Sequence, residues 1–340
     1  MIVVLKPNQT PEKIQEVREH VVELGYDPRI IQGVERTIIA GVGDELSHRS
    51  LEFLQGMDAV ENVIPVQKRY KLTSRQFHPA DRVVRIGRHP VGAGNFQIIA
   101  GPCAVESRDQ IRTVAKDISA PGVRILRGGA FKPRTSPYDF QGLQEKGLEL
   151  LNEAKHDFGL AIATEVVATN HVQAVAEVAD ILQIGARNCQ NYNLLETVAA
   201  AGKPVLLKRG MAATIEEWLS AAEYLVVNGC EDVVLCERGI RTFEHATRAT
   251  LDISAVVIAR QETHLPVIVD PSHAAGRSNL VLPLAMAAVA AGADGLLVET
   301  HPDPVEALSD AAQQLPSGDF SQFVEALRPL VTLMGRTLCP

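Results

Sequence analysis

Residues 203–239 read KPVLLKRGMAATIEEWLSAAEYLVVNGCEDVVLCERG. The runs 205–207 and 233–235 consist of aliphatic residues and predict two short, buried strands. Between them, apolar residues recur at helical spacing over 215–227, which predicts an amphipathic helix. A strand, a helix and a second strand in this order predict a parallel β-α-β unit.

The same pattern recurs along most of the chain. Further apolar runs of strand length occupy 96–100, 123–126, 160–164, 181–184, 267–269 and 295–298, and helical stretches occupy 111–118, 143–155 and 282–290. The strands are continuously apolar, as expected of parallel strands that are buried on both faces. Eight such units predict a (β/α)₈ TIM barrel over residues 91–340. An open, doubly wound sheet is the alternative, but no Gly-x-Gly-x-x-Gly sequence follows the first strand.

Residues 1–70 predict a separate small domain. Their apolar runs and helical stretches follow the order β-α-β-β-α-β, which is the plan of a ferredoxin-like fold. Thr10 and Pro11 are suited to the start of its first helix, and a second helical stretch begins after Gly43. Residues 71–90 are rich in Arg, His, Pro and Lys and have little periodicity, so we expect a linker there.

The overall composition limits the classes of function. The chain has 340 residues, of which 46% are hydrophobic and 22% charged, and predicts a globular protein. A formal net charge of −8 argues against nucleic acid or an anionic membrane as a partner. No apolar run reaches the roughly 18 residues of a membrane span, and the N-terminus lacks the pattern of a signal peptide. The five scattered cysteines indicate free thiols, so we expect a cytoplasmic protein.

Side chains that carry charge or bind metals follow almost every predicted strand. In a TIM barrel, the carboxyl ends of the strands form the active site. A single basic residue at such a place is as often a loop cap as a functional group, but a full set at one end of the barrel indicates a functional site. These positions are Cys103, Arg127, Glu165, Arg187, Lys208, Arg238, His273 and Glu299.

The cationic side chains near the strand ends point to anionic substrates. So many positive charges in one cleft repel each other unless an anion neutralises them. Arginine matches carboxylate and phosphate oxygens with paired hydrogen bonds. The loop 128–137 adds glycines and hydroxyl groups, which suit a phosphate. The cations are Arg127, Lys132, Arg134, Arg187, Lys208 and Arg238.

A second group of residues combines sulfur, nitrogen and oxygen donors. This mixture of soft and hard ligands suits one divalent ion of Mn, Fe, Co or Zn better than Mg. Taken alone, Cys103 is equally suited to the core, and Asp310 to the surface. The candidate ligands are Cys103, His273, Glu299 and Asp310.

Six blocks of the predicted barrel resemble the signature blocks of 3-deoxy-D-arabino-heptulosonate 7-phosphate (DAHP) synthases. They are AGPCAVES (100–107), LRGGAFKPRTS (126–136), IGAR (184–187), KRG (208–210), CERG (236–239) and DPSH (270–273). They occur in order over essentially the whole barrel. The predicted domain 1–70 resembles the N-terminal extension of the feedback-regulated, single-barrel branch of that family.

The resemblance implies the condensation of phosphoenolpyruvate (PEP) with erythrose 4-phosphate, with release of phosphate, as the first step of the shikimate pathway to aromatic amino acids. It assigns the metal to the four candidate ligands above. It further implies that PEP is held by Arg127, Lys132, Arg187, Lys208 and Arg238, and erythrose 4-phosphate by Pro133, Arg134, Thr135 and Ser136.

Proton transfer in this reaction requires further groups. We expect the neighbouring positive charges to lower the pKa of Lys132 or Lys208, so that either can exchange a proton. Glu165 is a third candidate. The sequence leaves the choice among the three open.

The resemblance also implies regulation. Residues 1–70 are expected to bind tyrosine or phenylalanine, in the neighbourhood of residues 27–33, and to gate the mouth of the barrel. The alternative is that this domain only packs in an oligomer interface, since the family usually assembles as homodimers or homotetramers.

Three other functions compete with this interpretation. The nearest is 3-deoxy-D-manno-octulosonate 8-phosphate (KDO 8-phosphate) synthase, a sister enzyme that condenses PEP with arabinose 5-phosphate. Its corresponding loop typically contains an asparagine, whereas here Pro133 follows Lys132 directly and the loop is one residue shorter, which suits the shorter sugar. A Schiff-base aldolase with Lys208 or Lys132 as nucleophile is the second, and a barrel that only senses ligands is the third.

Overall fold

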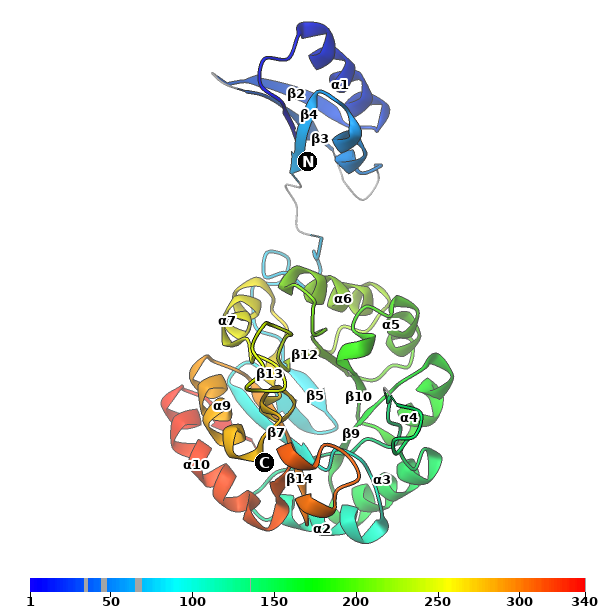
Figure 1. Ribbon diagram of the computed structural model, residues 1–340, viewed down its shortest axis with the longest axis vertical. Coiled ribbons are helices and arrows are strands. Elements are labelled where there is room, and N and C mark those ends of the chain that lie inside the picture. Colours follow the sequence, from blue (N-terminus) through cyan, green and yellow to red (C-terminus); the bar gives the residue numbers. More distant parts are fainter. Residues whose placement is uncertain (34–35, 44–47, 65–68, 135, 340) are drawn as a thin grey trace. The chain divides into compact units, whose positions relative to one another are not determined.

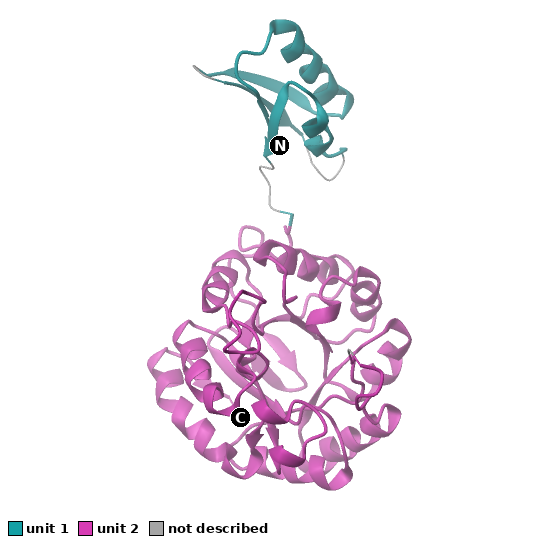
Figure 2. Cartoon of the chain, viewed as in Figure 1, with its two compact units in different colours: residues 1–69 teal, residues 70–340 magenta. Residues whose placement is uncertain are grey.

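The computed structural model describes residues 1–33, 36–43, 48–64, 69–134 and 136–339. The chain divides into two compact units, Met1–Arg69 and Tyr70–Pro340, which Figures 1 and 2 display. Within the described residues, no helix combines the length and the apolar character that a membrane crossing requires.

Unit 1 is a four-stranded antiparallel sheet with the strand order β2-β3-β1-β4. Its core lies between the sheet and two helical elements, since Val17, Val21, Leu51 and Leu54 are buried against it. The predicted ferredoxin-like fold is therefore confirmed. The elements are β1 (Ile2–Leu5), α1 (Pro11–Glu23), β2 (Asp27–Gln32), β3 (Thr37–Val42), the 3₁₀ helix η1 (Leu51–Gly56) and β4 (Val60–Ile64).

Of the two helical elements of unit 1, the first agrees with the sequence prediction and the second differs from it. Helix α1 begins where the sequence predicts, with Pro11 at its first turn and the Thr10 side chain accepting a hydrogen bond from the Lys13 amide. The second stretch, expected to begin after Gly43, is the short helix η1 instead. Residues 44–47 lie outside the described part of the chain.

Unit 2 is built on eight parallel strands that pair in sequence order. The last strand pairs with the first, which closes the barrel seen in Figure 1 and confirms the predicted TIM barrel. The strands are β7 (Asn95–Gly101), β8 (Ile125–Arg127), β9 (Ala161–Glu165), β10 (Ile181–Ile184), β11 (Val205–Lys208), β12 (Val233–Glu237), β13 (Val267–Val269) and β14 (Gly295–His301).

Helices follow the strands, and all but the short helix α8, which carries His273, form the outer layer of the barrel. They are α2 (Arg108–Ser119), α3 (Glu145–Phe158), α4 (Val172–Val178), α5 (Tyr192–Ala199), α6 (Ile215–Val227), α7 (Ile253–Glu262), α8 (Pro271–Ala275), α9 (Ser278–Ala290) and α10 (Phe320–Leu333). Two short strands extend the sheet, β15 (Leu315–Pro316) beside β14 and β16 (Thr337–Leu338) beside β7. The other 3₁₀ helices are η2 (Thr169–His171), η3 (Ala186–Asn188), η4 (Pro304–Glu306), η5 (Ala311–Gln313) and η6 (Ser317–Asp319).

The alternation of side chains along each strand divides the core in two. Residues such as Ile98 and Leu126 belong to the larger cluster between strands and helices. Their neighbours Ile99 and Ile125 belong to a smaller cluster inside the barrel. This two-residue period, with both faces apolar, is why the strands are continuous apolar runs in the sequence.

A hairpin fills the amino end of the barrel. Strands β5 (Val84–Ile86) and β6 (His89–Val91) pair antiparallel, and their valine and isoleucine side chains are buried in the interior cluster. A Cβ at Gly87 would lie 3.6 Å from that of Ala161, the first residue of β9. The stretch 71–90, expected to be a linker, thus lies within unit 2 and packs against the barrel.

One carboxylate fixes the beginning of unit 2. Glu223, on α6, accepts hydrogen bonds from the amides of Lys71 (3.0 Å), Leu72 (2.8 Å) and Thr73 (2.9 Å), and from the Thr73 hydroxyl (2.9 Å).

In Glu223→Gln, the new amino group would face donors, so we expect the free energy of unfolding to fall by about 1–3 kcal/mol in urea titrations. The control Glu149→Gln removes an exposed ion pair and should change the free energy of unfolding by less than about 1 kcal/mol. An equal loss in both variants would contradict this role of Glu223.

Candidate active site

The alternation of side chains along the strands, with a period of two residues, places polar side chains above the apolar interior of the barrel. Leu206 is followed two residues later by Lys208, and Leu297 by Glu299, so each pair points to the same side of its strand. Because the strands are parallel, these polar groups meet at the carboxyl end of the barrel. The same relation joins Ile125 to Arg127, Ala163 to Glu165 and Ile268 to Asp270.

A cavity of about 250 Å³ opens at this end of the barrel. Its lining contains more positive than negative side chains, which suits anionic ligands although the whole chain is acidic. The cations are Lys132, Arg134, Arg187, Lys208, Arg238 and Arg248, and the carboxylates are Asp139, Glu165 and Asp310.

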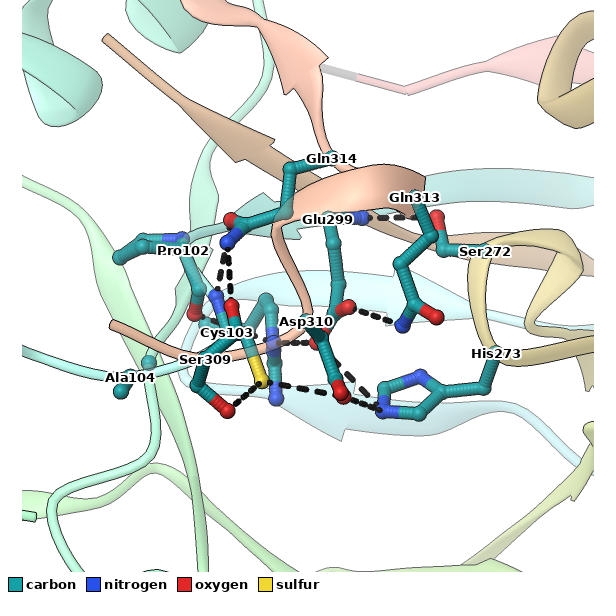
Figure 3. Close-up of polar contacts among 12 residues, drawn as sticks. Pro102, Cys103, Ala104, Ser272, His273, Glu299, Ser309, Asp310, Gln313 and Gln314 are labelled. Carbon is teal, nitrogen blue, oxygen red and sulfur yellow. Dashed lines mark hydrogen bonds and ion pairs between the residues drawn. The ribbon is translucent and has the colours of Figure 1, made fainter. Parts of the chain in front are cut away.

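The four candidate metal ligands lie together beside this cavity. Cys103, His273, Glu299 and Asp310 each offer one donor atom, and these atoms all lie within 4.8 Å of one another. Figure 3 shows their side chains converging from the end of β7, from α8, from β14 and from the segment after β14. The Oδ2 atom of Asp310 lies 3.4 Å from Cys103 Sγ and 3.7 Å from His273 Nε2.

Asp270 fixes the orientation of His273. Its Oδ1 atom accepts the His273 amide (2.9 Å) at the start of α8, and its Oδ2 atom lies 2.7 Å from His273 Nδ1. With Nδ1 donating to this carboxylate, Nε2 keeps its lone pair for the ligand cluster. Burial lowers the pKa of His273, although Asp270 opposes the shift, and this favours the neutral imidazole that metals bind.

Asp270 also joins the ligand cluster to the cations of the cavity. The same Oδ2 atom lies 2.6 Å from Lys208 Nζ, and both side chains are buried. The neighbouring His273 and Lys208 hold the pKa of Asp270 well below its usual range, although burial alone would raise it. Asp270 is therefore an anion that two positively polarised groups share.

Cys103 is buried and lies against Lys132. Burial, reinforced by Glu299, raises the pKa of the Cys103 thiol to about 11. Lys132 Nζ lies 3.0 Å from Cys103 Sγ and 2.9 Å from the Cys103 carbonyl oxygen. Burial favours the neutral amine of Lys132, but Cys103 and Glu299 outweigh it and raise its pKa. The lowered pKa that the sequence led us to expect at Lys132 is therefore wrong.

Arg127 is buried beside the ligand cluster and does not line the cavity. Its Nη1 atom donates to Glu299 Oε1 (2.6 Å) and to the Pro102 carbonyl oxygen (3.0 Å). Although burial raises the pKa of Glu299, His273 and Arg127 lower it more. The Nε atom of Arg127 is buried and has no hydrogen-bond partner among the described residues. This orphaned donor fits an anion, or the water that replaces one.

The loop that carries Lys132 is held from two sides. Arg187, in η3, donates to the Pro133 carbonyl oxygen (3.3 Å). Arg134 donates to the Ser309 hydroxyl (2.7 Å), beside Asp310. Pro133 and Arg134 line the cavity, while the Ser136 hydroxyl accepts the amide of Tyr138 in the same loop. Thr135 lies outside the described residues.

Glu165 reaches the cavity because its neighbour is a glycine. Its Oε2 atom accepts a hydrogen bond from Gln183 (3.2 Å). A Cβ at Gly185 would lie 2.1 Å from Glu165 Oε1, so any other residue at position 185 would force this carboxylate to move. Glu165 is the carboxylate of the cavity wall on the side of β9.

Several residues of the site are not among those predicted from the sequence. Asp270 lies within the quoted DPSH block, and its position three residues before His273 is the available signal. Asp139 and Arg248 lie in loops, and Gln313 ends the short 3₁₀ helix η5, so no strand or helix period predicts the direction of these side chains. Gln313 donates to Glu299 Oε2, and Arg248 lies 3.0 Å from Asp310 Oδ2.

Comparison with known proteins supplies an independent view of the chain. Residues 78–334 match the family model described as the DAHP synthetase I family, and residues 1–68 match the DAHP synthase ferredoxin-like domain. The phospho-2-dehydro-3-deoxyheptonate aldolase of Thermotoga maritima is 51% identical over 98% of this chain and 99% of its own length. The 2-dehydro-3-deoxyphosphooctonate aldolase of Acidithiobacillus ferrooxidans is 33% identical over 68% of this chain and 88% of its own length.

Solved structures agree in fold. The crystal structure of the DAHP synthase from Thermotoga maritima superposes with a TM-score of 0.95 at 50% identity and covers 99% of this chain and 98% of that one. A truncated form of the Thermotoga maritima enzyme superposes with a TM-score of 0.75 at 49% identity and covers 79% of this chain and 99% of that one.

Proposed function

Since the chain belongs to the DAHP synthetase I family and catalyses the reaction of DAHP synthases, we propose how its cavity condenses PEP with erythrose 4-phosphate. The condensation yields DAHP and phosphate and is the first step of the shikimate pathway. One observation carries the proposal: four candidate metal ligands converge beside a cavity that six cations line. Such a site suits two phosphorylated substrates and one divalent ion.

We propose that PEP occupies the inner part of the cavity. Arg187, Lys208 and Arg238 line it and offer donors to a carboxylate and a phosphate. Lys132 lies beside them, and the unpaired Nε atom of Arg127 offers a further donor from below. These cations are fixed by the barrel before the substrate arrives, so little reorganisation opposes binding.

Erythrose 4-phosphate is proposed to bind nearer the surface, against the loop 133–136. Arg134 and the backbone beside Pro133 line the cavity here. The hydroxyl group of Ser136, in the same loop, is proposed to complete the phosphate site. The contacts of Arg187 with Pro133 and of Arg134 with Ser309 hold this loop against the ligand cluster, which brings the aldehyde toward the inner substrate.

The donor set fits a divalent ion of Mn, Fe, Co or Zn. A thiol, an imidazole with one nitrogen already hydrogen-bonded, and two carboxylates combine soft and hard donors. When bound, the ion supplies a Lewis acid that polarises the aldehyde oxygen. Because the ligand is the thiolate, Cys103 must lose its proton on binding the metal.

The side chains of the protein then stabilise the charges of the substrates and exchange protons with them. As C3 of PEP bonds to the aldehyde carbon, Arg187, Lys208 and Arg238 hold the PEP carboxylate and phosphate in place. Water adds at C2 of PEP, and phosphate leaves. Lys132, Lys208 and Glu165 all reach the cavity, and we propose them as the groups that exchange protons with the aldehyde oxygen and the water.

Substrate preference and metal dependence test this function together. We expect phosphate release from PEP with erythrose 4-phosphate to be much faster than with arabinose 5-phosphate. Removing metal with a chelator should abolish turnover, and Mn²⁺ should restore it. The full-length match to the Thermotoga maritima enzyme, against a partial match to the octulosonate enzymes, supports this choice of aldehyde.

Three results would contradict it. A preference for arabinose 5-phosphate would favour KDO 8-phosphate synthase. Full activity after metal removal, together with borohydride trapping of an imine formed when Lys208 or Lys132 adds at C2 of PEP and displaces phosphate, would favour a Schiff-base aldolase. Absence of turnover with either aldehyde in the metal-loaded protein would favour a ligand sensor.

We further propose that unit 1 binds an aromatic amino acid and that binding inhibits the enzyme. The match of residues 1–68 to the DAHP synthase ferredoxin-like domain supports this role. The candidate binding region is strand β2, where Arg29 and Asp27 form an exposed ion pair (2.7 Å). Such exposed charges offer partners for the amino and carboxylate groups of an amino acid.

Deleting residues 1–69 tests this regulation. Unit 1 has its own hydrophobic core, and the truncated Thermotoga maritima enzyme has been solved, so the barrel should fold alone. We expect the truncated enzyme to keep turnover and to lose inhibition by tyrosine or phenylalanine in steady-state assays. A truncated enzyme that tyrosine still inhibits would place the effector site in the barrel.

A further inference from the structure

Arg248 reaches the ligand cluster from a loop that carries no assigned function. It lies between β12 and α7, ten residues beyond Arg238. Its Nη1 atom lies 3.0 Å from Asp310 Oδ2 and donates to Gln313 Oε1 (2.8 Å). The oxygen it contacts on Asp310 is the same one that faces Cys103 and His273. Arg248 therefore holds a candidate ligand at the atom that would bind the metal.

Gln313 extends this contact to a second ligand. Its side-chain amide is buried, accepts from Arg248 through Oε1 and donates to Glu299 Oε2 through Nε2. Figure 3 shows the Gln313 side chain directed at Glu299, with Asp310 between Cys103 and His273. The other oxygen of Glu299 lies 3.5 Å from His273 Nε2. Gln313 thus fixes the rotation of the Glu299 carboxylate and leaves Oε1 for the cluster.

The backbone of Arg248 rests on the helix that carries the third ligand. The amides of Arg248 and Ala249 donate to the carbonyl oxygens of Ala275 (3.3 Å) and Ala274 (2.9 Å), at the end of α8. The following Gly276 has a φ of +67°, and a Cβ there would lie 2.6 Å from Arg248 Cβ. This close packing ties the position of Arg248 to the helix of His273.

We propose that Arg248 and Gln313 form an outer layer of the metal centre that positions three of its four ligands: His273, Glu299 and Asp310. The proposal rests on the proposed metal site. A thiolate, two carboxylates and a divalent ion leave one net negative charge, which a fixed guanidinium nearby stabilises. Groups that orient metal ligands in this way typically contribute about 10–100-fold to metal affinity.

Removing either group should weaken metal binding. In Arg248→Met and Gln313→Met, we expect the Kd for Co²⁺ to rise about 10–100-fold. Arg248→Lys keeps the charge but loses the paired donors, so its Kd should lie between those of the wild type and Arg248→Met. Because the two side chains act in one chain of contacts, the double variant should lose less than the product of the two single losses.

Titration of the chelator-stripped, full-length protein with Co²⁺ provides the measurement. The sulfur-to-cobalt charge-transfer band reports binding through Cys103, and competition with a chelator gives the Kd. Arg241→Met is the matched control, since Arg241 is exposed in the same loop, and its Kd should equal that of the wild type. Thermal unfolding of the metal-free variants identifies any that fail to fold, in which case Arg248→Lys carries the test.

The outcomes separate the two proposals. If wild-type protein gives no charge-transfer band, the metal site fails and the outer layer fails with it. If the wild type gives the band and the Arg248 and Gln313 variants keep its Kd, the metal site stands and the outer layer is refuted. An unchanged Kd with a raised KM for either substrate would make Arg248 a substrate-binding residue instead.

Discussion

Replacing Cys103 by alanine is expected to lower kcat/KM by more than about 100-fold, because a metal ligand contributes more than the outer groups whose loss costs about 10–100-fold. The sulfur lies 3.4 Å from Asp310 Oδ2 and within 4.8 Å of every other candidate donor. Without it, the remaining imidazole and two carboxylates make a weaker and harder site. Steady-state kinetics with added Mn²⁺ and the metal content of the purified protein give the two readouts.

A second cysteine provides the matched control. Cys339 is partly exposed and follows β16, at the amino end of the barrel, so Cys339→Ala should leave both readouts unchanged. The Cys103 side chain is small and fully buried, and its loss should cost little stability compared with the loss of activity. Turnover of Cys103→Ala at a rate near that of the wild type would refute the proposed metal site.

Replacing Lys208 by methionine is expected to reduce both stability and activity. Lys208 and Asp270 form a buried ion pair at 2.6 Å, and removing one partner of such a pair costs about 3–5 kcal/mol. The same change removes a cation that faces the proposed PEP site, with an expected loss of about 100-fold or more in kcat. Urea unfolding and steady-state kinetics with varied PEP measure the two effects separately.

A double variant distinguishes the two effects. In Lys208→Met with Asp270→Asn, no uncompensated carboxylate remains, so the free energy of unfolding should be higher than in Lys208→Met alone. It should stay about 1–3 kcal/mol below the wild-type value, because Asp270 accepts both the backbone amide and Nδ1 of His273 and the single amide oxygen of asparagine can accept only one of them. Activity should stay low, because the cation is still missing. Recovery of activity together with stability would show that Lys208 acts only on folding.

The barrel could be predicted from the sequence because its strands are buried on both faces. Each strand is then a continuous apolar run, and the residue after it lies at the carboxyl end of the barrel. Runs such as 181–184 and 267–269 coincide with β10 and β13. The hairpin of β5 and β6 could not be predicted, since its strands have three residues each and lie in a basic stretch.

The residues of the site likewise divide into those that the sequence predicts and those that it does not. Side chains such as Lys208 and Glu299 follow from strand register, which is visible in the sequence. Arg248 comes from a loop and Gln313 from the end of the short 3₁₀ helix η5. The paths of both segments depend on tertiary packing, so nothing in their spacing reveals these residues. The direction of the Lys132 shift depends on distance, because Cys103 and Glu299 raise its pKa more than Arg127 and burial lower it. A list of nearby charges gives no such distances.

The hairpin of β5 and β6 has a consequence for the order in which substrates add. Because it fills the amino end of the barrel, both substrates share the route through the carboxyl end. Arg127 and Lys208, proposed for PEP, are each only 3% exposed, whereas Arg134, proposed for erythrose 4-phosphate, is half-buried. A sugar phosphate seated at the outer position would stand across the path to the inner one. If the two substrates bind as proposed, we expect PEP to enter first and the addition to be ordered rather than random.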